Sequence, residues 1–234
     1  EKYEFVAMAD LSKTAMEEYD TLFRDFEHYK PTHYSDAREM LDNESLDVVS
    51  VATWHTGHST WTKAAAAATP KAILCEKPMA LDIGSADEMI EVCQRSDVKL
   101  AISHQRRFLP SYTHTRNLIS EGAIGDIRLI TSESGAGLPN DASHHMDMYR
   151  YLLGDRDCLW VMGQVERNTD RYERNTRIED RAEAAFGFDG DTRAHIVSHL
   201  TPTYSQGCLV YGSDGMIEMR PNYLKVLNSS TAGK

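Results

Sequence analysis

Short apolar runs alternate with helix-forming stretches through the first hundred residues of this 234-residue chain. Four of these runs have the length and composition of buried strands, at residues 5–9, 46–53, 72–75 and 98–102. Helical stretches separate them, one beginning after a capping residue at Ser12 and another at about Asp82. Such alternation requires crossover connections, so we predict an α/β domain with a doubly wound parallel sheet over residues 1–104.

The pattern changes after residue 104. Strand-like runs then dominate, at residues 127–132, 159–164, 182–188, 193–199, 208–211 and 216–219. Several alternate with period two, which is typical of an antiparallel sheet with one solvated face. The sequence Asp189-Gly190-Asp191 predicts a hairpin turn, and one helix is expected over about 141–153, ended by Gly154. Residues 105–234 are therefore expected to form an α+β domain on an open, mainly antiparallel sheet.

Composition limits the partners of the chain. With 36 acidic and 25 basic residues the formal net charge is −11, which disfavours nucleic acid and anionic membranes as partners. No apolar stretch approaches the length of a membrane span. The four cysteines form no Cys-x-x-Cys pair, so neither a zinc site nor a disulfide framework is indicated. We expect a soluble, cytoplasmic protein with a small-molecule partner and no metal.

Polar residues follow two of the predicted strands. Asp10 ends the run 5–9, and an acidic residue at the end of the second strand of a dinucleotide-binding fold accepts hydrogen bonds from ribose hydroxyls. A turn or capping role is the alternative for Asp10. The run 72–75 is followed by Glu76, Lys77 and a proline. Because ligands bind outside the carboxyl ends of parallel strands, we expect Lys77 to enter a crevice; the alternative is a surface Glu-Lys pair before a turn.

Four blocks of sequence carry a resemblance to a known family. They are Cys-Glu-Lys-Pro-Met-Ala-Leu at 75–81, Arg-Arg-Phe-Leu-Pro at 106–110, Ile-Ser-Glu-Gly-Ala-Ile-Gly-Asp-Ile at 119–127, and the block 144–154 that begins His-His-Met-Asp. In this order and spacing, the chain resembles the glucose-fructose oxidoreductase, inositol dehydrogenase and MocA (Gfo/Idh/MocA) family of NAD(P)-dependent oxidoreductases. The resemblance implies a Rossmann domain, an open-faced sheet domain, and an active site between them.

One feature of that family has no counterpart in this sequence. The Gly-x-Gly-x-x-Gly turn after the first strand is missing, and only a polar tail follows the strand-like residues 223–226. We therefore expect a piece that begins at the second Rossmann strand and stops within the second domain. The pyrophosphate of NAD binds at the missing turn, so the piece alone is expected to bind NAD weakly and to behave poorly in solution.

The resemblance implies a catalytic pair, Lys77 and His144, placed across the substrate from one another. Oxidising an alcohol requires a base, and histidine, with an ordinary pKa of about 6.5, can accept the proton. Lysine stays cationic and can polarise the substrate oxygen. Two registers, Asn140 with His144 or Asp141 with His145, share the i, i+4 spacing. Family members usually carry an Asp three residues after the histidine, as His144 does, so Asn140 takes the other Asp position and is expected to bind substrate.

The same resemblance implies cofactor contacts for further residues. Thr53 ends the run 46–53 and His58 lies shortly after it, at the strand edge where the family meets cofactor or substrate. Glu76 is expected either to hold Lys77 or to face solvent, and Arg107 either to reach the cofactor or to pack its stem at a helix end. The expected cofactor is NAD, with NADP as the alternative because Lys13 could approach a 2′-phosphate.

The expected function is a dehydrogenase acting on a sugar, polyol, cyclitol or sugar derivative. The alternatives are an NAD-dependent glycosidase of the same fold and a non-catalytic ligand sensor; retention of both catalytic positions argues against the sensor. The resemblance also implies a homo-oligomer formed through the C-terminal sheet.

Overall fold

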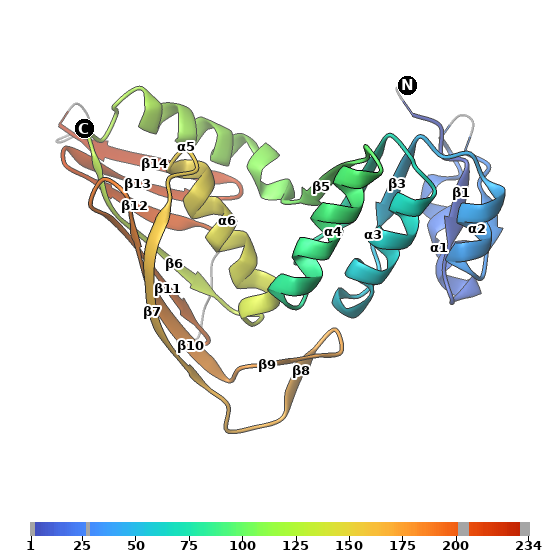
Figure 1. The fold of residues 1–234 in the computed structure, drawn as a ribbon. Coiled ribbons are helices and arrows are strands. Elements are labelled where there is room, and N and C mark those ends of the chain that lie inside the picture. Colours follow the sequence, from blue (N-terminus) through green and yellow to red (C-terminus); the bar gives the residue numbers. More distant parts are fainter. Residues whose placement is uncertain (1–2, 27–28, 201–205, 230–234) are drawn as a thin grey trace. The chain divides into compact units, whose positions relative to one another are not determined.

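The computed structural model describes residues 3–26, 29–200 and 206–229, and its ribbon is drawn in Figure 1. The chain divides into two compact units. The first consists of Glu1–Thr53 with Gly57–Ala101, and the second of Trp54–Thr56 with Ile102–Lys234. We keep residues 1–104 and 105–234 as the proposed domains.

The first unit alternates strands and helices along the chain, as expected for an α/β domain. Its elements are β1 (Ala7–Ala9), α1 (Lys13–Phe23), β2 (Thr32–Tyr34), α2 (Ala37–Asn43), β3 (Val48–Val51), the 3-10 turn η1 (His55–Gly57), α3 (His58–Ala67), β4 (Ala72–Glu76), α4 (Ile83–Arg95) and β5 (Lys99–Ser103). Strand β1 pairs in parallel with β2, and β3 pairs in parallel with β4. Strand β5 lies next to β4 in the same sheet. The predicted strands and parallel pairing are confirmed.

The parallel strands of the first unit form two ladders, β1-β2 and β3-β4-β5, in the described residues. No strand of that part of the chain is hydrogen-bonded to both β1 and β3. This arrangement agrees with the expected doubly wound sheet without its first Rossmann strand. Strand β2 was not predicted, because three residues are too few for a periodic signal.

Local capping chemistry sets two helix starts in this unit. The Ser12 hydroxyl accepts a hydrogen bond from the Ala15 amide at 3.2 Å and caps α1. The Asp82 carboxylate accepts from the Ser85 amide at 2.8 Å and caps α4. Both starts were predicted, because a short polar side chain satisfies amides that lack a partner in the first helical turn.

The second unit is built on one large sheet. Its elements are η2 (Gln105–Phe108), α5 (Pro110–Ser120), β6 (Ile127–Ser134), the π-helical turn η3 (Leu138–Ala142), α6 (Ser143–Leu152), β7 (Cys158–Glu166), β8 (Arg171–Glu173), β9 (Thr176–Ile178), β10 (Arg181–Phe188), β11 (Thr192–Ser198), β12 (Cys208–Gly212), β13 (Gly215–Arg220) and β14 (Tyr223–Asn228). In the described part of the chain, its strand order is β14-β13-β12-β6-β11-β10-β7. The pairs are antiparallel except for β6 with β11.

Helices α5 and α6 cover one face of this sheet (Figure 1). The core between them is apolar: Ile130, Ile196 and Val210 from central strands are fully buried, together with Tyr149 and Leu152 of α6 at 1% and 3% exposure. Strand β7 at the sheet edge is exposed along most of its length. The predicted open-faced, mainly antiparallel sheet is confirmed.

Turn chemistry explains one prediction that succeeded and one element that was missed. The Asp189-Gly190-Asp191 turn joins β10 to β11, with φ of 75° at Gly190 and 62° at Asp191. The hairpin β8-β9 was not predicted. Its turn residues Arg174 and Asn175 also have positive φ, 48° and 60°, but the three-residue strands that flank them mix charged and uncharged residues and show no apolar alternation.

Candidate functional site

The carboxyl ends of β3 and β4 bring together several of the predicted cofactor residues in the first unit. Because the two strands are parallel, Thr53 and Lys77 follow them at the same sheet edge. Thr53 is exposed, whereas Lys77 is 7% exposed. The Lys77 amide lies 3.3 Å from a carboxylate oxygen of Glu76, and the peptide between Lys77 and Pro78 is cis.

His58 connects the two segments that follow these strands. Its Nδ1 lies 2.7 Å from the Pro78 carbonyl oxygen, and its Nε2 lies 2.9 Å from the Thr53 carbonyl oxygen. The residue is fully buried. This geometry favours a positioning role for His58, in which the ring sets the spacing of the loops after β3 and β4, over the predicted direct contact with a cofactor.

Asp10 lies at the carboxyl end of β1 and is exposed. One of its carboxylate oxygens accepts a hydrogen bond from the Ser12 amide at 2.7 Å, which is the turn role considered as the alternative. A carboxylate has about four acceptor positions, so this bond leaves Asp10 able to accept from ribose hydroxyls as well. The position of Asp10 is therefore compatible with both roles.

His144 lies in the first turn of α6 in the second unit and is 6% exposed. Its ring meets that of His104 edge to face, with centroids 6.1 Å apart. The Nδ1 of His104 is 3.7 Å from the Asp147 carboxylate. Asp147, three residues after His144, therefore belongs to the same cluster of side chains.

Arg107 donates two guanidinium N–H groups to Asp147, with Nη2 at 2.6 Å and Nε at 2.8 Å from carboxylate oxygens. The hydrogen bonds that Arg107 donates to Asp147 raise the pKa of Arg107, whereas burial opposes the shift. The guanidinium is thus committed to a carboxylate of its own unit. This ion pair with Asp147 is a third role for Arg107, beside the two that were considered.

The competing register, Asp141 with His145, forms a buried network. The Asp141 carboxylate accepts from Arg106 Nη2 at 2.7 Å and from the Ser134 hydroxyl at 3.1 Å, and His145 Nε2 lies 3.6 Å from it. Burial alone would raise the pKa of Asp141, but His145 and Arg106 outweigh it and hold that pKa well below its usual range. Because His145 is 0% exposed, its ring has no surface that a substrate could contact.

Asn140 precedes α6 in η3 and is buried. Its side-chain amide donates to the Glu173 carboxylate at 3.3 Å, which ties the β8-β9 hairpin to the segment that carries His144. Sequence reasoning did not identify Glu173 or His104. No local signal could have found Glu173, because its contact depends on a hairpin that the sequence did not reveal.

Two features that would indicate other classes of protein, a metal cluster and a membrane span, are absent from the described residues. In that part of the chain, no three His, Cys, Asp or Glu side chains converge as a metal site would require. None of its helices has the length and hydropathy needed to cross a membrane.

Comparisons with known proteins match both halves of the chain. Residues 1–104 match the family model described as "Oxidoreductase family, NAD-binding Rossmann fold", and residues 112–218 match "GFO/IDH/MocA C-terminal domain". The chain is 30% identical over 203 residues to trans-1,2-dihydrobenzene-1,2-diol dehydrogenase of Danio rerio, covering 82% of this chain and 60% of the relative. It is 31% identical over 136 residues to myo-inositol 2-dehydrogenase of Thermotoga maritima, covering 52% and 40%. The chain thus spans between two and three fifths of these relatives.

Solved structures share the fold. The WlbA dehydrogenase from Bordetella pertussis, solved with NADH and UDP-GlcNAcA, has a TM-score of 0.79 at 20% identity, covering 97% of this chain and 70% of that one. A levoglucosan dehydrogenase solved with NADH and levoglucosan has a TM-score of 0.81 at 20% identity, covering 98% and 68%. At this level of identity the likeness extends to the fold alone.

Proposed function

Because this chain belongs to the Gfo/Idh/MocA family of oxidoreductases, we propose that the protein is an NAD-dependent dehydrogenase acting on a secondary alcohol of a sugar, polyol, cyclitol or sugar derivative. The names of its relatives, a diol dehydrogenase and an inositol dehydrogenase, support an alcohol substrate. One structural observation carries the assignment of the base: Asp141 and His145 are sequestered with Arg106. This supports His144, rather than His145, as the proposed base.

Each proposed residue has a defined task. His144 accepts the proton of the substrate hydroxyl, and Lys77 donates a hydrogen bond to the same oxygen as it becomes a carbonyl. Asn140 hydrogen-bonds a neighbouring hydroxyl, and Glu76 holds the backbone of Lys77. A bound nicotinamide would supply the hydride acceptor. Assaying the complete protein against a panel of polyols and sugars with NAD and NADP would test this function; no turnover with any of them would contradict it.

Cofactor choice is expected to depend on Asp10. We predict that NAD binds more tightly than NADP, because a 2′-phosphate would meet a carboxylate at the end of β1. Lys13 could attract that phosphate, but its ammonium group lies 3.6 Å from a carboxylate oxygen of Glu17, and this ion pair partly neutralises its positive charge. Replacing Asp10 with serine should narrow the preference, as measured by the Kd of each dinucleotide for the complete protein.

Asp25→Ser is the matched control, since Asp25 is an exposed carboxylate of the same unit. It should leave the preference unchanged. A KM for NADP below that for NAD in the unaltered protein would contradict the assignment of Asp10.

Self-association through the C-terminal sheet is part of the proposal. Strand β7 at the sheet edge exposes Leu159, Val161 and Met162 at 66%, 61% and 70%. Exposed apolar strands of this kind mark interaction surfaces. We predict that the complete protein is an oligomer by light scattering and that Val161→Lys with Met162→Lys shifts it toward the monomer. A monomeric unaltered protein would contradict this.

A further inference from the structure

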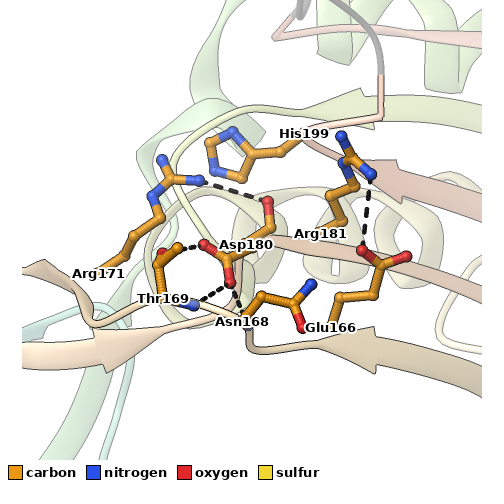
Figure 2. Close-up of a pocket in the computed structure, with 7 residues that line it drawn as sticks. All are labelled: Glu166, Asn168, Thr169, Arg171, Asp180, Arg181 and His199. Carbon is orange, nitrogen blue, oxygen red and sulfur yellow. Dashed lines mark hydrogen bonds and ion pairs between the residues drawn. The ribbon is translucent and has the colours of Figure 1, made fainter.

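A polar pocket lies in the second unit, where β7 ends and the β8-β9 hairpin leads into β10 (Figure 2). The cavity has a volume of about 450 Å³, and seven residues line it, all labelled in Figure 2. They come from the end of β7, the loop into β8, the first residue of β8, the two residues where β10 begins, and the residue after β11. None of them belongs to the dehydrogenase site proposed above, so the pocket requires a separate explanation.

The two carboxylates of the pocket already have partners. Asp180 accepts hydrogen bonds from the backbone amides of Asn168 and Thr169, at 2.5 and 2.9 Å, and from the Thr169 hydroxyl. These bonds, that of the Thr169 hydroxyl first, lower the pKa of Asp180. A Glu166 carboxylate oxygen lies 3.6 Å from Nη1 of Arg181. The acceptor groups of the pocket are therefore largely used by the protein itself.

Two other side chains of the pocket, Arg171 and His199, are less fully occupied. Arg171 has five N–H groups, and one of them donates to the backbone carbonyl of Asp180 at 3.3 Å, a neutral acceptor. No carboxylate of the described residues forms an ion pair with Arg171. The buried Nε2 of His199 has no hydrogen-bond partner among those residues. In Figure 2, the His199 ring lies close to the Arg171 guanidinium and Asp180.

A surplus of donors selects a ligand that accepts hydrogen bonds and carries negative charge. The planar fork of arginine matches the two oxygens of a carboxylate or phosphate group. The volume is within the range of about 300–1,000 Å³ that small-molecule sites occupy. We propose that this pocket binds a small molecule bearing a carboxylate or phosphate group, with Arg171 as its main anchor and His199 as a second donor.

Binding can be measured directly, independently of any dehydrogenase activity. Isothermal titration of the complete protein with inorganic phosphate and with D-glucuronate is expected to give saturable binding of at least one of them, and none with neutral acetamide. Arg171→Gln keeps a polar side chain but removes the charge, and it should weaken that binding at least about 10-fold. Arg171→Lys keeps the charge but loses the planar fork. Its affinity for the ligand should lie between those of the unaltered protein and Arg171→Gln.

Arg177→Gln is the matched control, because Arg177 lies on β9 of the same hairpin, pairs with Asp170 at 2.9 Å and does not line the pocket. It should leave the affinity unchanged, and the thermal unfolding temperature of each variant shows whether it is folded. Binding of phosphate alone or of glucuronate alone would identify which of the two groups the pocket takes. Absence of binding for both, unchanged affinity in Arg171→Gln, or equal loss in Arg177→Gln would overturn the proposal.

Discussion

Lys77→Ala and His144→Ala are each expected to lower the kcat of the complete protein by about 10²–10⁴-fold, the usual contribution of a general acid or base. Without His144 the hydroxyl proton has no positioned acceptor, and without Lys77 the developing carbonyl oxygen loses its cationic donor. Steady-state kinetics with the preferred alcohol and saturating NAD would measure both effects. Loss of His144 should also remove the rise of kcat/KM with pH on the acid side, because that limb reports the base.

His145 provides the control for the choice of histidine. His145 is fully buried beside Asp141, so His145→Gln should alter stability more than turnover of the folded enzyme. Circular dichroism would establish the folded fraction of each variant before rates are compared. Turnover abolished in His145→Gln but retained in His144→Ala would show that Asp141 and His145 form the catalytic register, and retention in both would contradict the mechanism.

The second large effect concerns stability. Asp141→Ala should lower the free energy of unfolding by about 3–5 kcal/mol, because it leaves the Arg106 guanidinium and His145 buried without their carboxylate. Chemical denaturation at neutral pH would measure it. The control Asp170→Ala removes an ion pair whose Asp side chain is 78% exposed, and it should cost less than about 1 kcal/mol.

The difference in the free energy of unfolding between the unaltered protein and Asp141→Ala should depend on pH with a defined sign. The pKa of Asp141 is lowered in the folded protein, so its carboxylate stabilises the fold above the unfolded pKa of about 3.9 and loses that contribution as pH falls further. The gap between the unaltered protein and Asp141→Ala should therefore be full at neutral pH and narrow below about pH 4. Equal stability of the two proteins at pH 7 would show that the network contributes nothing.

Local signals account for most of what the sequence predicted correctly. Ser12 and Asp82 cap helices through atoms three residues away, and the turn at Gly190 depends on backbone freedom at single positions. Apolar period and run length likewise depend on neighbouring residues, which is why the α/β character of the first unit and the open sheet of the second followed from the sequence. The four blocks that resemble the family then indicated which histidine and which lysine to propose as the catalytic pair.

What the sequence could not determine depends on partners distant along the chain. Arg107 meets Asp147 across 40 positions, and Arg106 meets Asp141 across 35, so no local pattern could reveal that both guanidinium groups are committed to carboxylates. His58 likewise joins the ends of two strands, one of them 20 residues away at Pro78. The free energy of a buried charge or ring is set by whichever groups the fold brings within a few ångströms. The sequence therefore determined most of the elements and, through the family resemblance, the proposed catalytic pair, whereas only the tertiary structure decided which polar side chains remain available to a ligand.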